Sequence, residues 1–353
     1  METETMEAFT ASSSDSSTFV YTDDFPVPEL GKLHSDFTNL PTNATEVLIK
    51  VFCSSVNPSD LSTDAYLKPK PLGSDVVGTI VAINGSSRFS IGDVVWGDIG
   101  ANADLASDPT IVSKELGAYA QYAVALDTQL SLAPVDSISL FEACGLPKVA
   151  LTTYKALVWY AGAPWPQSVG GPRSPRVLVL GGSGGTGSAA IQLAVYFGAA
   201  SVATTTSSGN FDYCSSLGAT QLIDYHTTDW QDVFQEGDLD IIFDTVGSAG
   251  TAADALALLS KSGGRFVTIA GALAPSWQVP AGTTQNNFIN SDTNLASAPQ
   301  LSALKDIVDA GGLAMPSISV YGLDQTSEAF ATSKAGHVVG KLVISITNDT
   351  EVS

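Results

Sequence analysis

The sequence predicts an α/β protein with two domains, one rich in β-strands and one built on a doubly wound parallel sheet. Its 353 residues exceed the length of one ordinary domain, which is about 100–200 residues. Short β-branched runs separated by Gly, Asn, Ser and Pro occupy the first third of the chain. From residue 176 onward, apolar strands alternate with helical segments, as they do in parallel sheets.

The β-rich part contains predicted strands at residues 47–52, 78–83, 92–96 and 117–124, a spacing typical of a compact barrel or sandwich. Residues 141–160 are rich in Ala and carry apolar residues at helical spacing, so we expect helices there that break at Pro147. A last strand is expected at residues 341–346.

The second part contains predicted strands at residues 176–180, 201–205, 221–225, 240–243 and 265–269, with helices at 188–197 and 211–217. Such alternation indicates right-handed βαβ units and a parallel sheet. We therefore expect one domain at residues 1–145, completed by 295–353, and a second domain at residues 146–294.

Charge and cysteine content limit the partners and the compartment. A formal net charge of −21 repels phosphate backbones and anionic lipids, so we expect no nucleic-acid or membrane partner. Adaptation to a salty environment is an alternative reason for this charge. The acidic N-terminal segment lacks the features of a signal or transit peptide. Cys53, Cys144 and Cys214 form no CxxC pair and indicate buried free thiols in a reducing, cytoplasmic compartment.

A glycine-rich loop follows the strand at 176–180 and opens the next helix. Gly182-Ser-Gly184-Gly-Thr-Gly187 fits the GxGxxG pattern in this context. The first glycine permits the tight turn, Gly184 lets the backbone approach a pyrophosphate, and Gly187 lets the helix pack against the strand. Phosphates then lie at the helix N-terminus, whose N–H groups and dipole favour negative charge. The loop predicts a bound dinucleotide; a turn without a ligand is the alternative.

The second strand of this domain ends in Thr204-Thr-Thr-Ser-Ser-Gly-Asn210. It lacks the Asp or Glu that binds the ribose 2′-hydroxyl of NAD. Because a carboxylate there would repel a 2′-phosphate, its absence and the several hydroxyl groups favour NADPH, although no Arg or Lys occurs in this segment.

Seven short segments match the motifs of one enzyme family in the same order. They are Ser54–Asp60 (SSVNPSD), Leu72–Gly78 (LGSDVVG), Gly117–Tyr122 (GAYAQY), Leu146–Tyr154 (LPKVALTTY), Val177–Gly187 (VLVLGGSGGTG), Phe243–Gly247 (FDTVG) and Gly336–Lys341 (GHVVGK). The chain resembles a medium-chain dehydrogenase/reductase of the quinone oxidoreductase branch. This resemblance implies a GroES-like catalytic domain, a Rossmann cofactor domain, NADPH-dependent oxidoreductase activity on a small molecule, and a homodimer.

The zinc alcohol dehydrogenases of this family carry a catalytic cysteine where this chain has Asn57, and a histidine where it has Ser74. The four-cysteine zinc loop is missing too, and three scattered cysteines with His34, His226 and His337 do not readily form a tetrahedral site. We therefore expect no metal. Because no metal then polarises an isolated carbonyl, the expected substrate is a quinone or an α,β-unsaturated carbonyl.

The resemblance also assigns roles to residues. Asn57 is expected beside the nicotinamide and Tyr66 near the substrate as a proton donor, and these two are the expected catalytic residues. The alternatives are a turn residue at Asn57, a half-buried aromatic at Tyr66, and a Lys341 that only flanks the last strand. The expected cofactor contacts are Asn57, Thr152, Ser183, Gly184, Gly185, Thr186, Gly187, Thr205, Thr206, Ser207, Tyr225, Val246, Ala270, Gly271, Phe288 and Lys341.

Three functions remain open. The leading one is NADPH-dependent reduction of quinones or enones. The second is enoyl-thioester reduction in fatty-acid or polyketide synthesis, because relatives with that activity share Asn210-Phe211-Asp212. The third is a dinucleotide-binding structural or regulatory protein, since a fold does not fix a function.

Overall fold

The structure is a computed structural model that describes residues 4–11, 19–31, 41, 43–61, 70–100, 117–161, 174–287 and 296–347. The chain divides into two compact units, Met1–Lys148 with Ser291–Ser353 (unit 1) and Val149–Asn290 (unit 2). The boundaries expected from the sequence, after residues 145 and 294, lie near these. Among the described residues, no helix is long and apolar enough to span a bilayer.

Unit 1 contains a seven-stranded sheet with the order β15-β16-β3-β5-β6-β8, in which β7 also pairs with β3, and a smaller sheet with the order β2-β1-β4. All these pairs are antiparallel except β15 with β16. The strands are β1 (Thr5–Ala11), β2 (Phe19–Pro26), β3 (Glu46–Ser55), β4 (Lys70–Pro71), β5 (Asp75–Ile83), β6 (Val94–Asp98), β7 (Tyr122–Leu126), β8 (Leu130–Leu132), β15 (Ile318–Gly322) and β16 (Lys341–Ser345).

The core of unit 1 follows from the two-residue period of its strands. Val47 and Val51 of β3 are completely buried on the face that packs into the core. Helix α8 (Thr326–Ala335) contributes Phe330, which packs edge-on against Phe9 and Tyr119 with ring centroids 5.5 and 5.9 Å apart. Helix α7 (Ala298–Asp309) belongs to the same unit.

The helices before the glycine loop break where the sequence predicts. Helix α2 (Leu140–Cys144) begins with a capping box between Ser139 and Glu142. Pro147 is the first residue of α3 (Pro147–Tyr154), a position that suits proline because the N–H it lacks has no partner within the helix. A π-helical turn, Lys155–Tyr160, follows α3.

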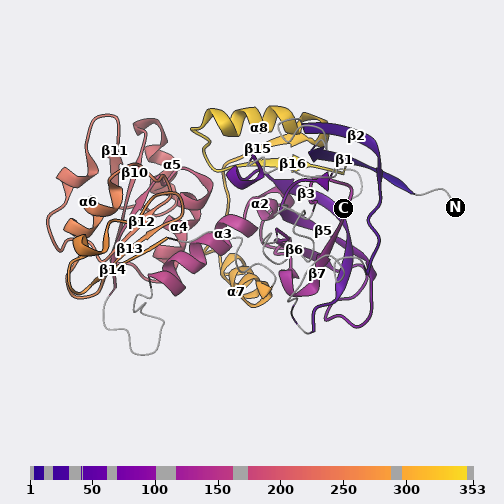
Figure 1. The fold of residues 1–353 in the computed structure, drawn as a ribbon, viewed down its shortest axis with the longest axis horizontal. Coiled ribbons are helices and arrows are strands. Elements are labelled where there is room, and N and C mark those ends of the chain that lie inside the picture. The colour runs from indigo at the N-terminus through magenta and orange to yellow at the C-terminus, as the bar shows by residue number, and fades with distance from the viewer. Residues whose placement is uncertain are drawn as a thin grey trace. The chain divides into compact units, whose positions relative to one another are not determined.

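Unit 2 is a six-stranded parallel sheet with the order β11-β10-β9-β12-β13-β14. The chain moves outward from β9 to β10 and β11 on one side and then returns to add β12, β13 and β14 on the other side. Right-handed crossovers therefore place α4 and α5 on one face of the sheet and α6 on the other. Figure 1 shows α4 and α6 on opposite sides of this sheet. The predicted Rossmann architecture is confirmed. The elements are β9 (Arg176–Leu180), α4 (Gly185–Tyr196), β10 (Ser201–Thr206), α5 (Phe211–Ser216), β11 (Gln221–Asp224), β12 (Ile241–Asp244), α6 (Thr251–Leu258), β13 (Gly264–Thr268) and β14 (Thr283–Asn287).

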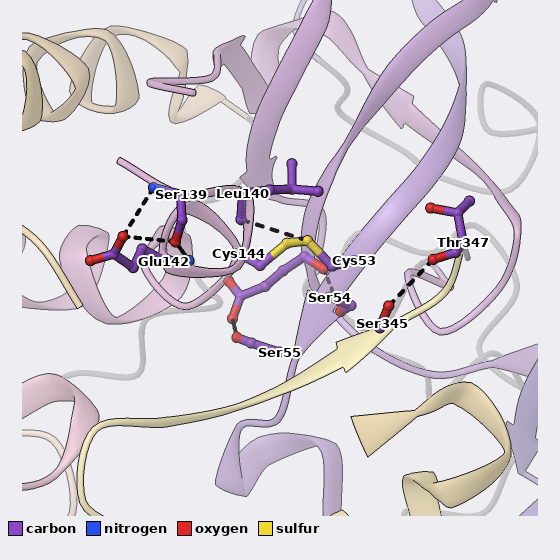
Figure 2. Close-up of a disulfide and its surroundings, with 10 residues drawn as sticks. Cys53, Ser54, Ser55, Ser139, Leu140, Glu142, Cys144, Ser345 and Thr347 are labelled. Carbon is purple, nitrogen blue, oxygen red and sulfur yellow. Dashed lines mark hydrogen bonds between the residues drawn. A yellow bond between two sulfur atoms is a disulfide. The ribbon is translucent and has the colours of Figure 1, made fainter. Parts of the chain in front are cut away.

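The expectation of three free thiols is wrong for two of the cysteines. Cys53 in β3 and Cys144 at the end of α2 form a disulfide, with Cα atoms 6.1 Å apart (Figure 2). Cys214 is free and buried. The two paired cysteines are 91 residues apart in the sequence and meet only because α2 packs on β3, so their spacing could not predict the pairing.

Candidate functional site

The glycine loop joins β9 to α4, and its three pattern glycines differ in what a side chain would meet. A Cβ at Gly187 would collide with the carbonyl oxygen of Gly181 and lie 2.8 Å from the Cα of Gly182. A Cβ at Gly182 would collide with the hydroxyl of Thr204. A Cβ at Gly184 would meet nothing closer than the Gly181 carbonyl oxygen, at 3.6 Å. Protein packing therefore requires Gly182 and Gly187, whereas Gly184 leaves open space where α4 begins.

This open space suits a phosphate group. Gly184 caps α4, and the next three residues, Gly185, Thr186 and Gly187, form the first turn of the helix. First-turn N–H groups have no carbonyl partner within their own helix, and the helix dipole adds positive potential at this end. No acidic residue lies in the turn. The residues present therefore fit the pyrophosphate of a dinucleotide.

Hydroxyl groups gather beside the glycine loop, at the carboxyl ends of β10 and β11. The Thr206 hydroxyl donates to Ser183 Oγ at 2.9 Å, and the Ser207 hydroxyl donates to Tyr225 Oη at 3.1 Å. Thr205 Oγ1 accepts the N–H of Gly181, the residue just before the glycine loop, at 3.0 Å. These contacts lie among residues that the resemblance implied as cofactor contacts: Tyr225 and Thr205 to Ser207 around the adenosine phosphate, and Ser183 in the glycine loop.

An acid lies near this cluster, but it comes from the third strand. Asp224 ends β11 and pairs in register with Thr206 of β10. Its Oδ1 accepts the His226 N–H at 3.0 Å and lies 2.9 Å from His226 Nδ1. The backbone bond from His226 and the hydroxyl of Ser208 lower the pKa of Asp224 to about 2. Asp224 and His226 had no expected role at the cofactor site. Only strand register places the end of β11 beside the end of β10, and the sequence pattern does not give that register.

The loops after β12 and β13 also lie at the carboxyl ends of the parallel strands, beside the glycine loop. The Asp244 carboxylate accepts the N–H of Val246 at 2.9 Å, and the Thr268 hydroxyl accepts the N–H of Gly271 at 2.9 Å. Val246 is exposed, while Asp244 and Thr268 are buried. Two buried side chains therefore shape the turns that hold Val246, Ala270 and Gly271, which the resemblance implied as cofactor contacts.

Thr152 lies in α3 and is buried. Its neighbour Thr153 donates from Oγ1 to the Thr186 carbonyl at 3.2 Å, which ties α3 to the first turn of α4 within unit 2. Thr153 lies in the matched motif Leu146–Tyr154 but had no expected role.

Asn57 lies just after β3 and is held by several hydrogen bonds within unit 1. Its Nδ2 donates to the Ser55 carbonyl at 3.2 Å and to Asp75 Oδ2 at 2.8 Å. Its Oδ1 accepts from Lys341 Nζ at 2.7 Å. Both amide hydrogens are therefore committed to protein acceptors. The catalytic role expected for Asn57, and its expected place beside the nicotinamide, stay predictions.

Lys341 begins β16 and has a buried ammonium group. In addition to Asn57, Nζ donates to the Val56 carbonyl at 2.8 Å and lies 3.7 Å from Asp75 Oδ2. Burial lowers the pKa of Lys341, and the charges of Asp75 and Asp60 oppose that shift. A Lys341 that reaches a cofactor phosphate would have to give up these contacts.

Asp60 adds a second buried carboxylate to this unit. Its Oδ2 accepts the Asn57 backbone N–H at 2.9 Å and the hydroxyl of Tyr119. Burial raises the pKa of Asp60 to about 6, although the charge of Lys148 lowers it. Lys148 in turn lies 3.5 Å from Asp98. The motif matches included Tyr119 and Lys148 but gave them no role.

Three further expectations concern single residues. Tyr66 and Phe288 lie outside the described residues. His337, one of the three histidines considered as metal ligands, is the one non-glycine residue with a positive φ in the part of the chain that the structure describes, at 62°. No group of three or more His, Cys, Asp or Glu side chains that could hold a metal occurs among the described residues.

Comparisons with known proteins identify the family. Residues 43–135 match the family described as alcohol dehydrogenase GroES-like domain, and residues 217–344 match the family described as zinc-binding dehydrogenase. A 2-methylene-furan-3-one reductase from Solanum lycopersicum is 30% identical over 334 residues, covering 92% of this chain and 77% of that protein. The chain therefore belongs to the medium-chain dehydrogenase/reductase family, as its motifs indicated.

Other similar proteins differ in their named activities. A chloroplastic NADPH-dependent alkenal/one oxidoreductase from Arabidopsis thaliana is 29% identical, covering 92% of this chain and 78% of that protein. A trans-enoyl reductase from Trichoderma harzianum is 34% identical over 63% of this chain and 62% of that protein. Among solved structures, a quinone oxidoreductase from Coxiella burnetii shares the fold, with a TM-score of 0.73 and 24% identity over 97% of this chain and 99% of that one. The chain is an oxidoreductase of this family with a dinucleotide-binding fold.

Proposed function

We propose that the protein uses NADPH to reduce quinones or α,β-unsaturated carbonyl compounds without a catalytic metal. The observation that carries the proposal is the open position at Gly184, at the start of α4 and beside the hydroxyl-lined end of β10. Gly182 and Gly187 are explained by packing, but no contact with the described residues explains why residue 184 lacks a side chain. A pyrophosphate at this place supplies the reason.

The preference for NADPH is supported by the end of β10, which carries hydroxyl groups and no acid. Asp224 does not take the place of such an acid in our proposal, because its carboxylate is engaged with His226 and Ser208. The name of the Arabidopsis relative supports the same cofactor.

The metal-free reaction is supported by Asn57, which stands where zinc-dependent members have a cysteine. Its Nδ2 and Oδ1 both already contact protein groups. NADPH, when bound, supplies a hydride. Negative charge then develops on the substrate oxygen, and a donor must stabilise it. Because Asn57 has no N–H to spare, Tyr66 is the proposed donor.

The experiment is a substrate panel that follows NADPH absorbance, with quinones, enones, a trans-enoyl thioester and saturated ketones at matched concentrations. We expect turnover of quinones or enones, little with saturated ketones, and tighter binding of NADPH than of NADH. Replacing Tyr66 with Phe is expected to lower kcat by about 10²–10³. Faster reduction of a saturated ketone, or equal binding of NADH, contradicts the proposal.

Enoyl-thioester reduction is the second candidate. It is favoured by the 34% identity to a trans-enoyl reductase, and by Asn210, whose amide lies 3.4 Å from Ser183 Oγ at the glycine loop. Preference for the thioester in the panel would select this function. Tight NADPH binding with no reduction of any compound would select a structural or regulatory role. A homodimer and a cytoplasmic location stay predictions.

A further inference from the structure

One side chain between Arg176 and Lys261 can carry a positive charge, and it is His226. The sequence between these two residues contains no other histidine, lysine or arginine, although it includes the glycine loop and the whole of β10 and β11. Arg176 begins β9 and pairs with Asp240, and Lys261 precedes β13 and pairs with Glu236. Both flanking cations therefore lie toward the amino ends of the strands. A phosphate group at the carboxyl ends of β10 and β11 has His226 as the one cation that this span offers.

The imidazole of His226 is fixed in the turn after β11. Its Nδ1 lies 2.9 Å from Asp224 Oδ1, and its backbone N–H donates to the same oxygen at 3.0 Å. The ring also stacks on Tyr225, with centroids 4.2 Å apart and planes 29° apart. The side chain is nevertheless 56% exposed. The ring is therefore held before any ligand binds, and a ligand can still reach it.

The contact with Asp224 determines where the ring can take up a proton. Hydrogen bonds from His226 and Ser208 lower the pKa of Asp224 to about 2, so it is a carboxylate near neutral pH and only accepts hydrogen bonds. Nδ1 of His226 therefore carries a hydrogen in both the neutral and the protonated ring. In the neutral ring Nε2 is an acceptor, and protonation makes it a charged donor. Histidine is the side chain whose charge ordinarily changes between about pH 5 and 8.

The neighbouring hydroxyl groups supply donors without charge. Ser183 Oγ accepts from the hydroxyl of Thr206 at 2.9 Å and from Asn210 Nδ2 at 3.4 Å, which occupies both of its lone pairs. Its own hydrogen is therefore directed toward another acceptor. Tyr225 Oη accepts from the Ser207 hydroxyl at 3.1 Å, and its hydrogen is likewise left to donate. These hydroxyl groups suit the oxygens of a phosphate, but they do not compensate its charge.

We propose that binding of NADPH is proton-linked through His226: the imidazole takes up a proton at Nε2 and pairs with the 2′-phosphate of the cofactor. This inference rests on the proposed use of NADPH, and it adds a regulation of that site by pH. Asp224 and Tyr225 are the titratable groups that contact His226 in the described part of the chain. Because binding and protonation favour each other reciprocally, affinity for the phosphorylated cofactor should rise as the pH falls toward about 6. NADH has no 2′-phosphate, so its affinity should not depend on His226.

The test measures binding by calorimetry at about pH 6 and about pH 8.5, on either side of the range in which histidine changes its charge. NADP⁺ and NAD⁺ are the probes, because the oxidised cofactors are stable in weak acid and differ only in the 2′-phosphate. This phosphate itself gains a proton with a pKa of about 6, so each measurement is compared with that of His226→Asn. At the lower pH, wild type should bind NADP⁺ about 3–10-fold more tightly than this variant. At the higher pH the two proteins should bind it equally, and NAD⁺ should not distinguish them at either pH.

Two further variants serve as controls. His226→Lys keeps a positive charge at both pH values, so it should bind NADP⁺ tightly at the higher pH, where wild type loses its advantage over His226→Asn. His337→Asn removes an exposed histidine from unit 1, and asparagine tolerates the positive φ of 62° there. This second control should leave the pH dependence of wild type unchanged.

The outcomes separate this inference from the proposed function. Equal pH dependence in wild type and His226→Asn overturns the inference, and so does a variant that loses affinity for NADP⁺ and NAD⁺ alike. In both cases the proposed function stands if wild type prefers NADP⁺ to NAD⁺. If wild type shows no such preference at either pH, the NADPH-dependent function fails together with the inference. Because His226 is exposed, urea denaturation should find each variant at this position folded.

Discussion

Alanine substitutions at two glycines of the same loop should affect two different properties, stability at one position and cofactor binding at the other. Gly184 and Gly187 lie three residues apart, and each alanine variant adds one methyl group. Gly187→Ala places the methyl against the Gly181 carbonyl and 2.8 Å from the Cα of Gly182. Gly184→Ala places it 3.6 Å from the Gly181 carbonyl oxygen, an ordinary van der Waals distance that requires no shift of the described chain. The first variant should therefore lose stability, and the second should lose cofactor binding.

The magnitudes follow from these contacts. Overpacking against backbone costs about 1–3 kcal/mol of unfolding free energy, and more where the backbone cannot move, so Gly187→Ala should be strongly destabilised. Gly184 has φ −74° and ψ 168°, which alanine adopts without strain. Alanine is a poorer helix cap than glycine, which lowers the unfolding free energy by up to about 1 kcal/mol. Alanine also reduces the conformational entropy of the unfolded chain, which raises the unfolding free energy by about 0.4–1 kcal/mol and offsets this loss. The methyl displaces the pyrophosphate, and we expect NADPH to bind at least about 10-fold more weakly, a loss of about 1.4 kcal/mol.

The assays are urea denaturation for stability and fluorescence titration with NADPH for affinity, both on each variant and on wild type. A control is Gly263→Ala, in the turn before β13, where a Cβ would meet no described atom within 4 Å; its positive φ of 106° should cost some stability, but NADPH binding should not change. If Gly184→Ala binds NADPH as tightly as wild type while remaining folded, the loop does not hold a pyrophosphate and the cofactor argument is refuted.

Local sequence patterns predicted much of unit 2. The strand at residues 176–180, the glycine loop and the helix after it depend on residues close together in the chain, and the structure confirms them. By contrast, β14 (Thr283–Asn287) has the sequence TTQNN and no apolar residue. It is an edge strand held by pairing with β13 and by the Gln285 amide, which bonds both the N–H and the carbonyl of Ala274. Hydrophobic periodicity cannot detect such a strand.

The polar cluster around Asn57 could not be predicted for a different reason. The sequence named Asn57 and Lys341, but 284 positions separate them, and no local signal indicates that they meet. Pairing of β16 with β3 brings them together, since Val343 lies opposite Ser55 in that ladder. Long-range strand register, which the sequence pattern leaves open, therefore determines what Lys341 contacts.

Three further predictions concern the metal, the disulfide and a buried acid. Elemental analysis should find well under one zinc per chain, and a chelator that removes activity would contradict the metal-free proposal. Replacing Cys53 and Cys144 with Ser should lower the unfolding free energy by about 2–5 kcal/mol, measured by denaturation without reductant; three alkylatable thiols in the unreduced, unfolded wild type would contradict the disulfide. Asp60→Asn tests the pKa that burial raises from 3.8 to about 6. A raised pKa means that the folded state binds the proton more tightly, so Asp60 stabilises the fold below pH 4 and loses that contribution as pH rises through 6. Asparagine keeps an oxygen for the Asn57 N–H and the hydroxyl of Tyr119 but does not titrate. The stability of Asp60→Asn relative to wild type should therefore increase between pH 4 and pH 7, by up to about 3 kcal/mol for a shift of about two units. A difference that stays constant with pH would show that Asp60 is ionised in the folded protein throughout this range.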